Sequence, residues 1–152
     1  MRIGKTASIT KCPSISAKGK SNIFIGEHCA FEGGSISSVE DAEIHIGSYT
    51  CFGENDIIVA RRKVTIGERC IIAPNVVFYD HDHKYDDSGY TTGYKYDEIV
   101  IGNHVWIGAN VTVLKGTRIG DNCVVGAGCV LKGEIPSNTM IYTKQNYVIR
   151  EL

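Results

Sequence analysis

The stretch Asp80-His81-Asp82-His83 places two histidines and two carboxylates within four consecutive residues. Histidine titrates near neutral pH, so an accessible imidazole can accept a proton during a reaction and later return it. A neighbouring carboxylate can hold the ring and select its tautomer, and both aspartates are candidates by proximity in sequence. Residues 81 and 83 share one face of an extended segment. The pattern indicates acid–base chemistry, with an ordinary exposed loop histidine as the competing interpretation.

These residues belong to a long segment, residues 79–98, that contains no aliphatic residue. It holds five tyrosines, five aspartates, one glutamate, two histidines and two glycines. Long connections inside a compact domain are usually functional. We therefore predict a protruding loop over residues 79–98 that carries the site.

The element that must position this loop is a repeat of six residues. From residue 101 an aliphatic residue recurs at every sixth position, and glycine follows most of them: Ile101, Ile107, Val113, Ile119, Val125 and then Val130 or Leu131. This period is neither the 3.6 of an amphipathic helix nor the 2 of a long strand. It predicts very short strands separated by turns.

The same period appears earlier in the chain, starting near Ile3, Ile25, Ile46 and Ile66. Three hexads make one turn of a triangular prism with the aliphatic side chains inside, so each turn is buried only by its neighbours. Glycine and the Asn/Asp pairs are expected at the corners, where left-handed backbone is tolerated. We predict a single all-β domain over residues 1–152, with roughly five to six turns and a C-terminal tail over 137–152.

The composition of the chain bears on which kinds of molecule it binds. The 152 residues include 16 basic and 17 acidic side chains, which gives no reason to expect binding to nucleic acid or to a membrane surface. No apolar run approaches the ~20 residues of a membrane span. The N-terminal residues lack the apolar core of a secretory signal, so a cytoplasmic location is expected.

The six cysteines do not form a CxxC pair, so zinc-ribbon spacing is absent. Four of them fall four places after an aliphatic residue of the repeat: Cys29, Cys70, Cys123 and Cys129. At that position we expect small buried hydrophobic residues, in preference to a catalytic thiol or a disulfide set.

The segments 101–111 (IGNHVWIGANV) and 119–128 (IGDNCVVGAG) resemble the hexapeptide-repeat acyltransferases. The resemblance covers about residues 23–141 and is most specific over 46–78 and 101–136. It implies a left-handed parallel β-helix, a homotrimer and acetyl-CoA as co-substrate. Within the family, the galactoside and maltose O-acetyltransferase branch and the polysaccharide O-acetyltransferases are the most similar.

The register of that branch implies roles for individual residues. Its catalytic histidine falls on His83, and His81 and Asp82 are the other catalytic candidates. Its tryptophan falls on Trp106, which is expected either to line the acceptor pocket or to pack against a neighbouring chain. The residues expected at acetyl-CoA are small or basic: Ala109, Ala127, Gly128, Lys132, Gly133 and Lys144. The lysines would meet phosphates as point charges, or are ordinary surface residues.

The acceptor site of the branch carries over less well. Its acceptor-binding asparagine falls on Gly53, although Asn55 lies two places on, and its acceptor-binding aspartate falls on Arg61. Arg61-Arg62-Lys63 is therefore either a contact for an anionic sugar or a solvated corner. Asn55, Trp106 and Tyr85 are the substrate-binding candidates. The tyrosines of the loop suit stacking on a sugar ring or packing between subunits.

The resemblance implies an acetyl-CoA-dependent O-acetyltransferase that modifies a sugar hydroxyl, with a bacterial surface polysaccharide or its precursor as acceptor. His83 would act as general base in a direct transfer. The alternatives are N-acetylation of an amino sugar or nucleotide sugar, and a non-catalytic or carbonic-anhydrase-like β-helix. A metal is not expected, because Ala109, Asn110 and Val113 stand where an anhydrase of this class needs histidine ligands.

Overall fold

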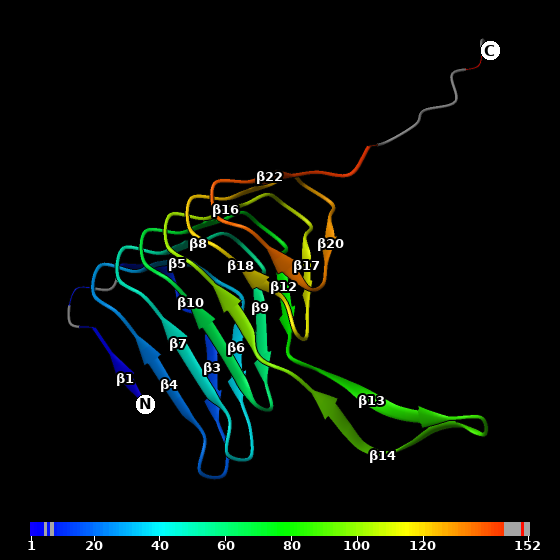
Figure 1. Cartoon of the computed structure of the whole chain (residues 1–152). Helices are drawn as coiled ribbons and strands as arrows, with labels where there is room; N and C mark the ends of the chain where they lie inside the picture. The colour runs from blue at the N-terminus through cyan, green and yellow to red at the C-terminus, as the bar shows by residue number, and fades with distance from the viewer. Residues whose placement is uncertain (5, 7, 145–149, 151–152) are drawn as a thin grey trace.

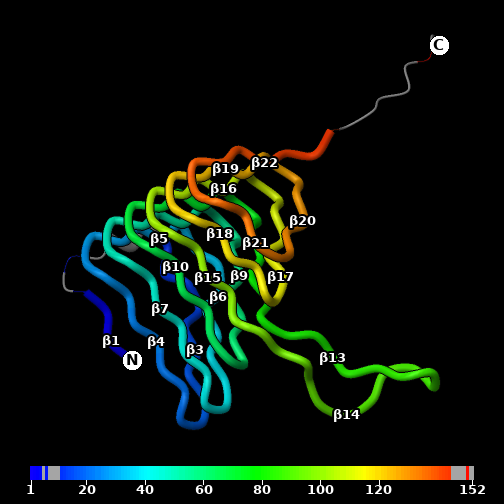
Figure 2. Tube along the Cα trace, in the orientation of Figure 1, coloured from blue at the N-terminus to red at the C-terminus, as the bar shows by residue number. Residues whose placement is uncertain are grey.

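The chain forms a three-sided coil of short parallel strands with one hairpin that projects from it (Figure 1). This computed structural model describes residues 1–4, 6, 8–144 and 150. Three sheets, here called A, B and C, form the sides of the prism, and successive strands along the chain visit A, B and C in turn. The tube view follows six complete turns and the start of a seventh (Figure 2). This architecture is the predicted all-β coil, and it is consistent with a left-handed β-helix.

The strands have the following bounds. Sheet A contains β1 (Arg2–Ile3), β4 (Asn22–Ile25), β7 (Glu43–Ile46), β10 (Lys63–Ile66), β15 (Ile99–Ile101), β18 (Arg118–Ile119) and β21 (Glu134–Ile135). Sheet B contains β2 (Ser8–Lys11), β5 (Ala30–Glu32), β8 (Cys51–Phe52), β11 (Ile71–Ile72), β16 (Trp106–Ile107), β19 (Val124–Val125) and β22 (Met140–Ile141). Sheet C contains β3 (Ser14–Ala17), β6 (Ser35–Ser38), β9 (Ile57–Ala60), β12 (Val77–Tyr79), β17 (Thr112–Leu114) and β20 (Val130–Leu131).

The repeat of six exists because the coil strands from β4 to β21 each send one or two side chains, mostly aliphatic, into the prism. Parallel pairing stacks these side chains directly over one another, as in the ladder Phe52, Ile72, Ile107 and Val125 of sheet B. Every aliphatic position of the run from Ile101 is buried, and at its end the buried residue is Leu131, while Val130 is 68% exposed. The four cysteines predicted to be buried are buried and free.

Glycines of the hexads allow successive turns to pack closely together. The expectation of left-handed backbone at Gly102 and Gly120 was wrong. Neither has a positive φ. A Cβ atom at Gly67 would lie 2.4 Å from the carbonyl oxygen of Gly102 in the next turn. The left-handed residue comes two places later, at His104 (φ 56°) and Asn122 (φ 56°), where asparagine is the least strained choice after glycine.

Residues 79–98 protrude from the coil, as predicted, and they do so between sheets C and A. The segment forms an antiparallel hairpin of β13 (His81–Asp86) and β14 (Gly89–Tyr96). Tyrosine and threonine favour extended backbone, and Gly89 adopts a positive φ of 114° after the turn. In both views the hairpin projects away from the prism (Figures 1 and 2).

The C-terminal tail adds β22 to sheet B and then continues away from the coil (Figure 1). Residues 145–149 and 151–152 of the predicted tail lie outside the described residues. Within the described part of the chain, no helix is long and apolar enough to cross a membrane.

Candidate active site

Asp80 marks the point where the chain leaves sheet C for the hairpin, and its side chain is fully buried. Both of its oxygens accept hydrogen bonds from the backbone N–H of Arg61, at 2.9 and 3.0 Å. Oδ2 also accepts from the N–H groups of Arg62 at 2.7 Å and Lys63 at 2.8 Å. Three consecutive amides at the same corner of the preceding turn thus converge on one carboxylate. Asp80 ties the root of the hairpin to the coil.

His81 is the partner of this carboxylate. Its Nδ1 lies 3.0 Å from Oδ1 of Asp80, and its side chain is only 13% exposed. The ring meets two tyrosines edge-on, with centroid distances of 6.0 Å to Tyr79 and 5.3 Å to Tyr94. Because a carboxylate only accepts hydrogen bonds, Nδ1 of His81 is the donor in this contact. Sequence and packing together fix the orientation of this ring.

His83 lies two residues further along β13 and is exposed. It pairs across the hairpin with Tyr94, and the two rings are 4.7 Å apart. His81 and His83 therefore both contact Tyr94, as expected for residues on one face of a strand. Within the described residues, the ring nitrogens of His83 make no hydrogen bond, so they are available to an acceptor molecule.

The ring of Tyr94 also contacts a positively charged side chain of the coil. The guanidinium carbon of Arg61 lies 3.7 Å from the centroid of the Tyr94 ring, a close cation–π contact. Arg61 is further paired with Glu40, while its Nε is buried without a hydrogen-bond partner. We call Arg61, Asp80, His81, His83 and Tyr94 the hairpin-root cluster. It joins a base, a carboxylate, an aromatic ring and a cation.

Two other candidates on the hairpin, Asp82 and Tyr85, point elsewhere. Asp82 faces Lys115, with 2.8 Å between its Oδ2 and Nζ, so the carboxylate that contacts a histidine is Asp80. Tyr85 is 69% exposed and lies near the tip, where the ammonium of Lys95 is 4.8 Å from its ring centroid. Tyr85 therefore lies outside the hairpin-root cluster.

The residues predicted to contact acetyl-CoA are divided between two edges of the prism. Ala109, Ala127 and Gly128 lie at the corners that join sheet B to sheet C in the fifth and sixth turns, where Gly128 N–H donates to the Ala109 carbonyl at 2.9 Å. Lys132 and Gly133 lie at the corner that follows β20 and leads back to sheet A. Lys144 is exposed beyond β22.

The two remaining acceptor candidates also lie away from the hairpin. Asn55 adopts a left-handed φ of 61° at a corner between sheets B and C, and its amide reaches Oδ1 of Asn75 at 3.4 Å. Trp106 opens β16 on the outer face of sheet B and is 52% exposed. Within the described residues of one chain, no contact joins either of them to the hairpin-root cluster.

The outer face of sheet B carries an apolar ladder along its length. Parallel register stacks the first residues of successive strands on one another: Cys51, Ile71, Trp106, Val124 and Met140. Ile71, Trp106 and Met140 are each more than half exposed. An exposed apolar strip of this kind is typical of a surface that is covered by another protein chain.

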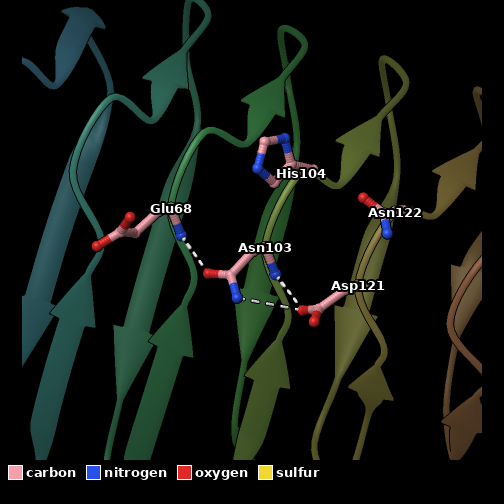
Figure 3. Close-up of a pocket in the computed structure, with 5 residues that line it drawn as sticks. All are labelled: Glu68, Asn103, His104, Asp121 and Asn122. Carbon is pink, nitrogen blue, oxygen red and sulfur yellow. Dashed lines mark hydrogen bonds between the residues drawn. The ribbon is translucent and has the colours of Figure 1, made fainter.

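A polar pocket lies at the edge where sheet A meets sheet B. It is lined by Glu68, Asn103, His104, Asp121 and Asn122 (Figure 3). Its side chains link successive turns. Asn103 Oδ1 accepts from the Glu68 N–H at 2.9 Å, and Asp121 Oδ1 accepts from the Asn103 N–H at 2.6 Å. These side chains provide hydrogen-bond acceptors for backbone N–H groups at the corners of the coil. We therefore interpret the pocket as structural. His104 lies on this edge, as expected for a solvated histidine.

No group of three or more His, Cys, Asp or Glu side chains arranged to hold a metal ion occurs within residues 1–4, 6, 8–144 and 150. The two carboxylates beside the histidines are instead engaged with protein groups. Asp80 is occupied by backbone amides and His81, and Asp82 by Lys115.

Reasoning from the sequence missed Tyr94 as the ring that unites the two histidines, and it left Arg61 undecided. The signal for Tyr94 was the alternation of residues in 89–96, which marks a strand that pairs with 81–86 and brings Tyr94 opposite His83. The contact between Arg61 and Tyr94 spans 33 positions in the chain and has no local signature in the sequence.

Comparison with known proteins agrees with this architecture. Residues 98–133 match the family described as bacterial transferase hexapeptide (six repeats). The chain is 39% identical to the galactoside O-acetyltransferase of Escherichia coli K12 over 73% of this chain and 55% of that protein. It is 43% identical to a putative lipopolysaccharide biosynthesis O-acetyl transferase of the same strain, over 55% and 48% of the two chains.

A solved structure of a galactoside acetyltransferase in complex with coenzyme A is 34% identical, with a TM-score of 0.61, over 90% of this chain and 65% of that one. The chain spans about half the length of the curated relatives it matches. The repeat and the coil therefore identify a hexapeptide-repeat domain in this chain, and the relatives it resembles are named as acetyltransferases.

Proposed function

We propose that this chain catalyses transfer of an acetyl group from acetyl-CoA to a sugar hydroxyl, and that the acceptor is a bacterial surface polysaccharide or its precursor. The relatives named as a galactoside and a lipopolysaccharide O-acetyltransferase support the reaction class. The observation that carries the proposal is His83. Its imidazole is exposed, lacks a hydrogen-bond partner among the described residues, and stacks near Tyr94 at the hairpin root.

His83 would act as general base. It accepts the proton of the attacking hydroxyl while the oxygen forms a bond to the acetyl carbonyl carbon and the carbon–sulfur bond breaks. The imidazolium then returns that proton to the departing sulfur, so no proton is gained or lost overall. A positioned base of this kind contributes about 10²–10⁴-fold to the rate. No covalent bond between enzyme and acetyl group is required.

The residues predicted for the donor fit a long, narrow substrate. A Cβ atom at Gly128 or Gly133 would meet nothing within 4 Å, so the surface beside both glycines is open. The side chains of Ala109 and Ala127 are small enough to let a pantetheine arm lie against the backbone. Lys132 and Lys144 are exposed cations that would bind the phosphates. Acetyl-CoA supplies the activated thioester when it is bound there.

We infer that the site lies between subunits of a homotrimer. Within one chain, the hairpin-root cluster projects between sheets C and A, whereas Trp106 and Ala109 belong to sheet B and to its corner with sheet C. The apolar ladder of sheet B gives each subunit a surface to bury. Packing that ladder against a second copy would bring the donor residues of one subunit towards the hairpin of another.

Tyr94 and Arg61 suit a carbohydrate acceptor, because an aromatic face stacks on sugar C–H groups and a guanidinium binds hydroxyl or carboxylate oxygens. The test is a mass-spectrometric assay of the purified protein with acetyl-CoA and paired acceptors that carry either hydroxyl or amino groups on the same sugar. We expect an acetyl ester that hydroxylamine cleaves. A hydroxylamine-resistant amide would favour N-acetylation instead, and no acceptor-dependent product with any oligosaccharide would contradict the proposal.

A further inference from the structure

The buried pair Asp80–His81 is the feature of the hairpin root that general base catalysis by His83 does not use. Asp80 is fully buried and its two oxygens are bonded to the amides of three coil residues. Among the side chains that the structure describes, only that of His81 bonds this carboxylate. The pair therefore connects a rigid corner of the coil to the first residue of β13.

The geometry separates the two histidines by role. His81 is 13% exposed, bonded through Nδ1 and enclosed edge-on by Tyr79 and Tyr94. His83 is exposed and its contacts are with the rings of Tyr94 and Tyr90. A ring that is bonded and enclosed is suited to hold its neighbours, whereas an exposed ring with free nitrogens is suited to meet a substrate.

A continuous series of contacts runs from the coil to His83. Asp80 bonds His81, the edge of His81 packs against Tyr94 at 5.3 Å, and Tyr94 lies 4.7 Å from His83. Arg61 adds a second support, because its guanidinium packs against Tyr94 while its backbone N–H bonds Asp80. The hairpin otherwise projects from the prism, so its root is where its orientation is set (Figure 1).

We propose that Asp80 and His81 are positioning residues, which hold β13 and Tyr94 so that His83 is presented to the acceptor. This inference rests on the proposed function, and it assigns the base to His83 and not to His81. What His81 must supply is a donor N–H towards Asp80 and a planar group beside Tyr94. It need not supply a basic nitrogen.

Asparagine separates these requirements, because the amide of His81→Asn can donate to Asp80 from nearly the position of Nδ1 but cannot act as a base at neutral pH. We expect His81→Ala to lower kcat about 10–100-fold, the scale of a misplaced catalytic group, with KM for acetyl-CoA unchanged. His81→Asn should recover most of that loss. The matched control is His45→Asn, which removes a histidine that pairs with Glu43 on sheet A, away from the hairpin; its activity should equal that of the unmodified protein.

Two results would overturn the proposal. If His81→Asn is as inactive as His83→Ala, His81 is itself the base, and if His81→Ala keeps full kcat, the pair positions nothing. Hydrogen exchange provides a readout that does not depend on turnover. The amides of β13 and β14 should exchange faster in His81→Ala and not in His81→Asn, and equal protection in both variants would also contradict the positioning role. An unmodified protein that transfers no acetyl group would instead refute the proposed function, and the exchange result would still decide the role of His81.

Discussion

Asp56 is a carboxyl group at an interior position of the coil, and it offers a quantitative test of the packing. It precedes β9 and is 4% exposed, and the register places it in line with Val76 and Val111 of the next two turns. Its Oδ1 accepts from the Val76 N–H at 2.8 Å, whereas Oδ2 has no hydrogen-bond partner among the residues that the structure describes. Burial raises its pKa from 3.8 to about 7, although the nearby backbone amides of Val76 and Gly53 oppose this shift.

The sign of the effect follows from proton uptake. Between pH 4 and 7 the folded protein holds this proton and the unfolded chain does not, so the free energy of unfolding falls as pH rises. A shift of about 3 units at 1.36 kcal/mol each gives roughly 4 kcal/mol as the upper limit of that loss. Asp56→Asn keeps an acceptor for the Val76 N–H and cannot ionise. The variant should therefore be less sensitive to pH, and at pH 8 it should be more stable than the unmodified protein by up to that amount.

Urea unfolding at pH 5, 6, 7 and 8, at one fixed protein concentration, measures this difference. The histidines contribute equally to both proteins, so the change in stability difference with pH isolates Asp56. Asp41→Asn serves as the control because Asp41 is exposed. The reasoning is refuted if Asp56→Asn and the unmodified protein lose stability in parallel between pH 5 and pH 8.

Three further predictions concern the coil, the apolar ladder and the donor site. Gly67→Ala should lower the free energy of unfolding in urea by about 1–3 kcal/mol, because its Cβ would meet the next turn, and an unchanged midpoint would contradict that. Ile71→Asp should convert the proposed trimer to smaller species in light scattering, whereas an unchanged mass would rule out sheet B as the interface. Lys132→Ala should raise KM for acetyl-CoA several-fold with kcat retained, unlike the exposed control Lys20→Ala, and equal KM values would remove Lys132 from the donor site.

The sequence predicted the coil well because every turn repeats the same physical demand. One or two side chains per strand must fill the prism, and at Ile107 and Val113 an aliphatic residue does so without leaving a polar group buried. The predicted backbone conformation at the corners was less accurate. Glycine occurs at 102 and 120 because these residues contact the next turn, and the local sequence does not reveal that contact.

The hairpin was harder to predict, because its strands do not follow the period of six and contain no aliphatic residue to mark a buried face. The departure at residue 79 was visible, but the pairing of β13 with β14 depends on cross-strand contacts such as that of His83 with Tyr94. The preference for Asp80 over Asp82 as the partner of a histidine likewise arises from a distant element, the amides of Arg61 to Lys63. Contacts between residues so far apart in the chain require the three-dimensional fold.

The most direct test of the central claim is the activity of His83→Ala. With acetyl-CoA and an accepted sugar, kcat/KM should fall about 10²–10⁴-fold, while calorimetry should give an unchanged affinity for acetyl-CoA. Loss of turnover with retained donor binding is the result expected if His83 is the base that the hairpin presents. A His83→Ala protein that acetylates the sugar at the full rate would contradict the account.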